Sequence, residues 1–238
     1  MSEPAAFAAR SPLAAQQLVR LLQLASPALP IGGYSYSQGI EWAVECGDVH
    51  DAQTTASWIG DVLELVVAPG EAALAAQLIA AARESRWDDY RELNAWFRAS
   101  RETSELRAET EQMGASLRKL LFDLGLLTDA VQADIVPSLP LTLPAAFALA
   151  ICALDIEPQS ALVAYVWSWL ENQVLAAMKL VPLGQSSGQR LLLDLGARIP
   201  ELVADAMGRE RADITSFAPG LALASTLHET QYSRLFRS

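Results

Sequence analysis

The sequence predicts an all-α fold, a single-domain bundle of about ten helices. Apolar residues recur at intervals of three and four along nearly every long segment of the 238-residue chain. No stretch of β-branched and aromatic residues alternates for six positions between turn signals, so β-sheet is not expected. Hydrophobic residues make up 52% of the chain and charged residues 19%, enough apolar surface for a thick core or a partner interface.

The N-terminal half is expected to form a series of helices. Asp51 is placed to cap a helix that should run until Pro69-Gly70 stops it. A helix before it has an apolar face made of Leu18, Leu21, Leu22 and Ala25. The three helices after it have stripes of Leu74, Leu78, Ile79 and Ala82; of Trp87, Tyr90, Leu93 and Phe97; and of Leu106, Met113, Leu117, Leu120, Leu121 and Leu124.

The C-terminal half follows a proline-rich bend between Ile135 and Pro144. Pro158 suits the first turn of a long helix, and Pro200 opens another that Gly208 is expected to cap. The whole chain, 1–238, is interpreted as one domain. Residues 1–12 are expected to be a flexible N-terminus, and residues 228–238 a partner-binding tail.

One loop, Ser26–Glu41 with the sequence SPALPIGGYSYSQGIE, differs from the helices around it. Its prolines, Pro27 and Pro30, fix the backbone and remove two hydrogen-bond donors, and Gly32-Gly33 permits angles closed to other residues. Its tyrosines, Tyr34 and Tyr36, each combine an apolar ring with a polar tip. Such a loop is typical of a rigid contact surface rather than a solvated linker.

The overall charge and the cysteine content exclude several classes of protein. A net charge of −11 and a pI near 4.6 argue against nucleic-acid binding. Two cysteines are too few for a disulfide framework, which favours a reducing, cytoplasmic location, and no signal peptide is expected. The apolar stretch Ala161–Val181 contains Glu171 and Lys179, so we expect a buried helix and no membrane association.

A serine hydrolase is the enzymatic alternative. The stretch Gly184–Gly188 fits the pattern G-x-S-x-G, and Asp194, Asp205 and Asp213 precede His228 in the order that α/β-hydrolases use. Ser186 and His228 would be the nucleophile and base. That motif requires a strand before the serine, whereas the preceding residues have helical spacing, so a polar loop between helices is the preferred interpretation.

Metal and cofactor sites are not expected. Cys46 and His50 lie four residues apart, so they could share a helix face, but two ligands do not close a site. The adjacent pair His228 and Glu229 is equally weak. The chain contains neither a phosphate-binding loop nor a dinucleotide-binding glycine motif. We therefore predict no catalytic residues, no metal and no cofactor.

Two further segments carry cations and apolar groups together. Lys179 ends an apolar helix, near Gln185, Gln189 and Arg190. The C-terminal segment TQYSRLFRS has two arginines and no acid, and leaving its large apolar side chains in water is unfavourable. The segment therefore either docks on its own domain or docks on another protein, and residue chemistry alone does not decide between the two.

Four segments together resemble the UreF family of urease accessory proteins. They span most of the chain in the family's order, and the first and last are highly specific. They are LQLASPALPIGGYSYSQGIEWAVE (Leu22–Glu45), RETSELRAETEQMG (Arg101–Gly114), KLVPLGQSSGQ (Lys179–Gln189) and HETQYSRLFRS (His228–Ser238).

The resemblance implies a homodimeric, non-catalytic adaptor for maturation of the nickel centre of urease. Its implied partners are UreD (also called UreH), the GTPase UreG, whose hydrolysis it would modulate, and the urease apoprotein. The partner-binding residues that we assign on this basis are Pro30, Gly32, Gly33, Tyr34, Tyr36, Gln38, Glu41, Lys179, Gln185, Gln189, Arg190, His228, Glu229, Tyr232, Arg234, Leu235, Phe236 and Arg237.

Overall fold

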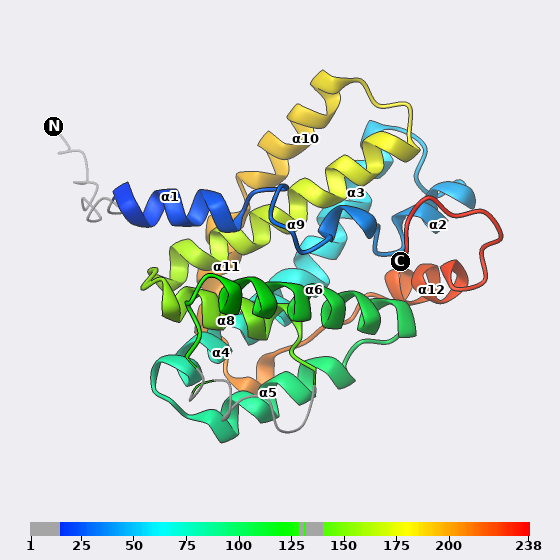
Figure 1. Ribbon diagram of the computed structural model, residues 1–238. Coiled ribbons are helices and arrows are strands. Elements are labelled where there is room, and N and C mark those ends of the chain that lie inside the picture. The colour runs from blue at the N-terminus through cyan, green and yellow to red at the C-terminus, as the bar shows by residue number, and fades with distance from the viewer. Residues whose placement is uncertain (1–14, 129–130, 132–139) are drawn as a thin grey trace, which may run out of the picture.

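The computed structural model describes residues 15–128, 131 and 140–238, and every regular element among them is helical (Figure 1). The all-α prediction is confirmed. The predicted flexible segment 1–12 and most of the proline-rich bend lie outside the described residues. The α-helices are α1 (Ala15–Leu24), α2 (Ile40–Glu45), α3 (Ala52–Val62), α4 (Ala73–Arg83), α5 (Trp87–Ala99), α6 (Ser104–Asp123), α8 (Leu143–Ala153), α9 (Pro158–Leu180), α10 (Gln185–Gly196), α11 (Ile199–Gly208) and α12 (Pro219–His228).

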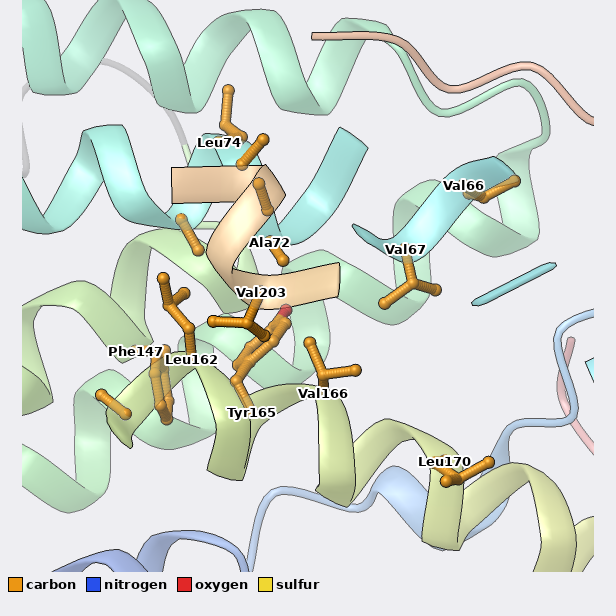
Figure 2. Close-up of a cluster of buried hydrophobic side chains, with 14 of the residues drawn as sticks. Val66, Val67, Ala72, Leu74, Phe147, Leu162, Tyr165, Val166, Leu170 and Val203 are labelled. Atoms are coloured by element: carbon orange, nitrogen blue, oxygen red, sulfur yellow. The ribbon is translucent and has the colours of Figure 1, made fainter. Parts of the chain in front are cut away.

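The core lies where α4, α8, α9 and α11 meet. Figure 2 shows Leu74 of α4, Phe147 of α8, Leu162 of α9 and Val203 of α11 gathered in one cluster. These side chains are almost completely buried, and each contributes roughly 1.5–3 kcal/mol relative to an exposed position. The helical stripes seen in the sequence therefore converge on one apolar interior, against which α6 and α5 also pack.

Pro69 does not end its helix, contrary to the sequence expectation. The helix continues from α3 through a π-helical segment, η2 (Leu63–Ala72), into α4. Pro69 has no N–H to donate, and the segment before α12 supplies another donor, because the Phe217 N–H lies 3.4 Å from the Leu65 carbonyl oxygen. The Thr215 N–H also donates to the Pro69 carbonyl, at 3.2 Å. These tertiary hydrogen bonds thus replace the backbone hydrogen bond that Pro69 cannot make within the helix.

The long helix formed by α3, η2 and α4 is the one described helix apolar and long enough to cross a membrane, by length and composition alone. In the most apolar 18-residue stretch of this helix, 78% is buried inside the protein. A helix in the core of a protein can be equally long and apolar, and the burial of this helix fits a core position. The stretch predicted as a buried helix, Ala161–Val181, is largely α9, which carries several of the core side chains.

Helix α1 packs through one edge of its predicted apolar face. Leu21 is buried, but Leu18 and Leu22 are exposed, so only part of that apolar face packs on the core. The helix is held by two side chains that donate to the backbone between α8 and α9. Arg20 donates to the Leu154 carbonyl at 2.5 Å, and Gln17 donates to the Asp155 carbonyl at 2.8 Å. The described residues therefore leave the outer face of α1 uncovered, and Figure 1 shows this helix at the edge of the bundle.

Predicted helix starts are confirmed at Asp51 and Pro158. The Asp51 carboxylate accepts from the Thr54 N–H at 2.8 Å in a reciprocal capping box, and Pro158 is the first residue of α9. The predicted cap at Gly208 is wrong by one position. Gly208 is still helical, and Arg209 is the cap with an extended backbone.

Candidate docking surface formed by the first loop and the C-terminal tail

Residues Pro30–Glu41, here called the first loop, fold as a short 3-10 turn, η1 (Gly33–Ser35), leading into α2. Gly32 and Gly39 adopt left-handed φ angles of 80° and 83°, which cost glycine least. A side chain at Gly39 would also meet the backbone of α12, because a Cβ would lie 3.2 Å from the Ser225 nitrogen. Gly32 therefore uses the backbone freedom that the sequence indicated for Gly32-Gly33, Gly33 does not take a left-handed φ angle, and Gly39 is a second left-handed position.

The two tyrosines of the first loop have opposite environments. Tyr34 is 66% exposed, whereas Tyr36 is 4% exposed. The Tyr36 hydroxyl donates to Gln112 of α6 at 2.8 Å, and its carbonyl accepts from Asn172 of α9 at 3.1 Å. Burial, followed by the nearby Glu109, raises the pKa of Tyr36. Tyr36 therefore anchors the loop, and Tyr34 remains free to contact a partner.

Gln38 joins the first loop to two helices. Its side-chain amide donates to Glu109 of α6 at 2.7 Å, and its amide oxygen accepts from the Trp169 indole of α9, also at 2.7 Å. Its φ angle of 51° is uncommon for a residue with a side chain. Such a conformation persists only where its surroundings hold it in place, and the two hydrogen bonds do so here.

The C-terminal tail, residues Glu229–Ser238, returns to the first loop and lies beside α2 (Figure 1). The Arg237 N–H donates to the Ser35 carbonyl at 2.9 Å, and the Ser37 N–H donates to the Ser238 carbonyl at 2.7 Å. Phe236 is buried, while Tyr232 and Leu235 are exposed. Of the two possibilities left open by the sequence, the structure shows docking on the protein's own domain, with an outer face still available.

Two carboxylates, the buried Glu41 and the partly buried Glu105, hold the tail. Glu41 accepts the backbone N–H groups of Leu235, at 2.5 Å, and of Phe236, at 2.9 Å. The His228 imidazole is completely buried between Glu41, at 3.1 Å from Nε2, and Glu105, at 2.6 Å from Nδ1. Glu105 also accepts from Arg234 at 2.6 Å. Charged partners strengthen these hydrogen bonds, so the tail is held at several points.

The neighbouring Glu229 has a different role. Its carboxylate accepts from the backbone N–H and hydroxyl of Ser104, at 2.8 and 2.6 Å, at the start of α6. These hydrogen bonds lower the pKa of Glu229. Glu229 therefore caps a helix from a distance, and the pair formed by His228 and Glu229 does not act as one site.

The third predicted segment joins this surface only in part. The Lys179 ammonium at the end of α9 lies 5.2 Å from the centre of the Phe236 ring, a cation–π contact. Gln185, Gln189 and Arg190 are exposed on α10, and the hydrogen bonds that hold the tail do not involve them. The structure thus brings Lys179 to the tail and leaves the α10 residues on a separate helix.

A cavity of about 130 Å³ lies beneath the first loop. Apolar side chains of α1, α6 and α9 form part of its wall, and Glu71, Arg101 and Tyr165 contribute polar groups. The Tyr165 hydroxyl donates to Glu71, and Arg101 lies 3.7 Å from the same carboxylate. Sequence reasoning assigned no role to Glu71, Glu105 or Glu109. Glu105 and Glu109 lie within the Arg101–Gly114 segment that resembles the family, whereas no sequence signal pointed to Glu71.

The hydrolase geometry is not present in the described part of the chain. Ser186 lies in the first turn of α10, after α9 and a short connection, and no strand occurs among the described residues. Both ring nitrogens of His228 face carboxylates, so neither faces a serine hydroxyl. The predicted polar loop is also corrected, because Gln185–Gly188 belongs to the helix.

Cys46 and His50, which the sequence left open as neighbours on one helix face, do not share a helix. Helix α2 ends at Glu45, and His50 lies in the loop before α3, where its Nδ1 is 3.0 Å from the Gly47 carbonyl. Within the described ranges, no group of three or more His, Cys, Asp or Glu side chains is placed to hold a metal. Cys46 and Cys152 are both free thiols.

Together, the fold and these hydrogen bonds define an all-helical protein in which the first loop and the C-terminal tail form one surface. The UreF family model matches residues 49–196. A urease accessory protein UreF from Azoarcus sp. (strain BH72) is 55% identical over 93% of this chain and 95% of its own length. One from Dechloromonas aromatica (strain RCB) is 51% identical over 93% and 98%, respectively. The chain therefore belongs to the UreF family of urease accessory proteins.

A fused relative is also similar to the whole chain. The bifunctional urease accessory protein UreEF of Bordetella bronchiseptica is 52% identical over 100% of this chain, which corresponds to 56% of that protein. In that relative, a UreF-like unit is therefore part of a longer bifunctional accessory protein.

Proposed function

We propose that this protein is a non-catalytic adaptor for assembly of the nickel centre of urease, which binds UreD (UreH) and recruits the GTPase UreG to the urease apoprotein. Membership of the UreF family supports a role in urease maturation. The particular partners, the modulation of GTP hydrolysis and a cytoplasmic location are parts of the proposal. The two free thiols fit a reducing compartment.

The observation that carries the proposal is the union of the first loop and the C-terminal tail in one surface. Buried anchors, Tyr36 and Phe236, hold the two segments from inside, while Tyr34, Tyr232 and Leu235 point their apolar area outward. Arg234 and Arg237 add exposed cations. Tyrosine and arginine are frequent anchors of protein interfaces, and a preshaped surface loses less entropy on binding.

The fused UreEF relative supports association with other accessory proteins. In that relative, the UreF-like unit belongs to the same polypeptide as the rest of the bifunctional accessory protein, so the two parts stay close together. This arrangement fits a protein whose role is to bring other components together. The resemblance of the first loop and tail to the family extends that expectation to UreD (UreH) and UreG.

The proposal is tested by affinity capture of purified UreD (UreH), followed by UreG with and without GTP. Tyr34→Ala and Leu235→Ala, combined, are expected to weaken capture of UreD (UreH) tenfold or more, because each residue is an exposed anchor. Far-UV circular dichroism should remain unchanged, since neither side chain is part of the core.

Phe122→Ala is the matched control. Phe122 is a similarly exposed aromatic residue near the opposite end of α6 from the tail, about 27 Å along the helix from Ser104. Its replacement should leave capture unchanged. Equal capture by the double variant and the unsubstituted protein would remove this surface from the proposal.

A further inference from the structure

We propose that the cavity beneath the first loop is a binding site for a small uncharged molecule with an apolar body and one carbonyl oxygen. The apolar walls of the cavity enclose the body of the ligand, and the Nε–H of Arg101 donates a hydrogen bond to its carbonyl oxygen. This site goes beyond the proposed function, because it belongs to the isolated protein and involves no partner.

Arg101 is the residue that points to a ligand. It lines the cavity and is only 7% exposed. Its guanidinium lies 4.4 Å from the centre of the Phe97 ring and 3.7 Å from the Glu71 carboxylate, so it is held on two sides. Among the described residues, its buried Nε has no hydrogen-bond partner. A buried donor without a partner is unfavourable, so an acceptor that enters the cavity gains a hydrogen bond that this side chain otherwise lacks.

The walls of the cavity suit a compact apolar body. Helix α6 contributes Leu106, Met113 and Leu117, and α8 contributes Phe147. All four side chains are buried. The volume of about 130 Å³ is close to that of cavities of about 150 Å³ that hold benzene when they are lined by such side chains. The ligand is therefore expected to be about the size of a single small ring.

The cavity reaches the surface beside the first loop. Among the residues that line it, Pro27, Tyr34 and Leu175 are exposed, whereas Arg101 is buried. The same cavity thus extends from solvent at Tyr34 to the guanidinium. A small molecule can enter along this route without separation of the core helices.

The charges in the cavity favour an uncharged ligand. An anion would meet the carboxylates of Glu71 and Glu109, and a cation would meet the guanidinium of Arg101. Both carboxylates already accept hydrogen bonds. Glu71 accepts from the Tyr165 hydroxyl, and Glu109 accepts from the Gln38 amide at 2.7 Å. Burial of a further charge without a partner is costly, whereas a carbonyl oxygen needs only the donor that Arg101 supplies.

Two probes of nearly equal shape test the site in the full-length protein. Cyclopentanone carries the carbonyl oxygen, and methylenecyclopentane has a CH₂ group in its place. With isotope-labelled methionine methyl groups, nuclear magnetic resonance should show a saturable shift of the Met113 methyl on addition of cyclopentanone, because Met113 lines the cavity. The exposed Met207 of α11 is the internal control and should not shift. An unresponsive Met113 would overturn the proposal.

Arg101→Met tests the hydrogen bond, because it removes the Nε–H. The affinity for cyclopentanone should fall about tenfold or more, while that for methylenecyclopentane should not fall, since only the ketone accepts from Arg101. Each probe is compared with itself, so the different hydrophobicity of the two probes does not enter. The matched control is Arg98→Met, on α5 outside the cavity lining, which should leave both affinities unchanged. An equal effect of Arg101→Met on the two probes would overturn the proposal.

The Nε–H resonance of Arg101 in the unsubstituted protein covers the case in which Arg101→Met does not fold because Glu71 loses its cation. Cyclopentanone should shift this resonance in proportion to site occupancy, and methylenecyclopentane should shift it much less. Equal shifts with the two probes would show an apolar cavity without the proposed hydrogen bond, and the proposal would be wrong. None of these measurements involves a partner, so this inference and the proposed function can fail separately.

Discussion

At Glu41, three groups converge on one carboxylate. Two are consecutive backbone N–H groups of the tail, and the third is the buried imidazole of His228. A hydrogen bond to a charged group contributes about 1.5–3 kcal/mol. The first loop and the tail thus depend on a residue that appears, in the sequence, as the only charge in its segment.

Glu41→Gln should loosen the tail, because a neutral amide is a weaker acceptor for the two backbone donors. The protection factors of the Leu235 and Phe236 amides are expected to fall tenfold or more at constant pH. Glu45→Gln, an exposed change on the same helix, is the control and should leave them unchanged. Full protection in Glu41→Gln would show that the tail is held elsewhere.

At the scale of elements, α6 and α8 approach one another closely at Gly114. A Cβ at this position would overlap the carbonyl groups of Leu141 and Thr142, immediately before α8. Thr142 is further held by Asn94 of α5, whose side-chain oxygen accepts from the Thr142 N–H at 2.9 Å. The approach is therefore set by backbone atoms that have little freedom to move.

Gly114→Ala should consequently lower the free energy of unfolding by about 1–3 kcal/mol, the usual cost of overpacking. Chemical denaturation measures the change. Gly208→Ala is the matched control, because it lies at the end of α11 with no atom within 4 Å of the added Cβ. It should be neutral or slightly stabilising. Equal stability of the two variants would mean that α6 and α8 can separate without cost.

At the scale of the whole molecule, α1 presents an apolar face that the described chain does not cover. Leu18, Val19 and Leu22 are 48%, 64% and 63% exposed, while Leu21 on the same helix is buried. A second copy of the chain is the proposed occupant, because the UreF resemblance implies a homodimer and an isologous contact would cover the same face on both copies.

Leu18→Glu combined with Leu22→Glu should convert a dimer to a monomer, because charges would then be buried in the interface. Light scattering after size-exclusion chromatography gives the mass directly. Leu193→Glu, another highly exposed leucine, but on α10, is the control and should not alter the mass. A dimer that survives the double change would place the interface on a different face.

The helices themselves were predictable from local patterns. Apolar residues at intervals of three and four occur in segments that fold as helices, and the Asp51 capping box involves residues only three positions apart. The specific motifs of the first loop and the tail also indicated the UreF family from their residues alone. Interactions of this kind lie within a few residues, so the sequence displays them directly.

The candidate site was predictable only in its components. The sequence singled out the first loop, Lys179 and the tail, but not that Tyr36 would be buried while Tyr34 stays exposed. Both residues are tyrosines of one short segment. Their different environments come from Gln112 and Asn172, which are far away in the sequence.

By itself, the sequence determined an all-helical chain of the UreF family, because helical periodicity, capping and family motifs each depend on residues that are close together in the chain. Only the tertiary structure decided that the helix continues through Pro69, that the tail folds back onto Glu41, and that Glu109 lies buried beneath Ser238. Each of these depends on donors and acceptors separated by more than a hundred residues, and no local pattern specifies which distant group will complete a hydrogen bond.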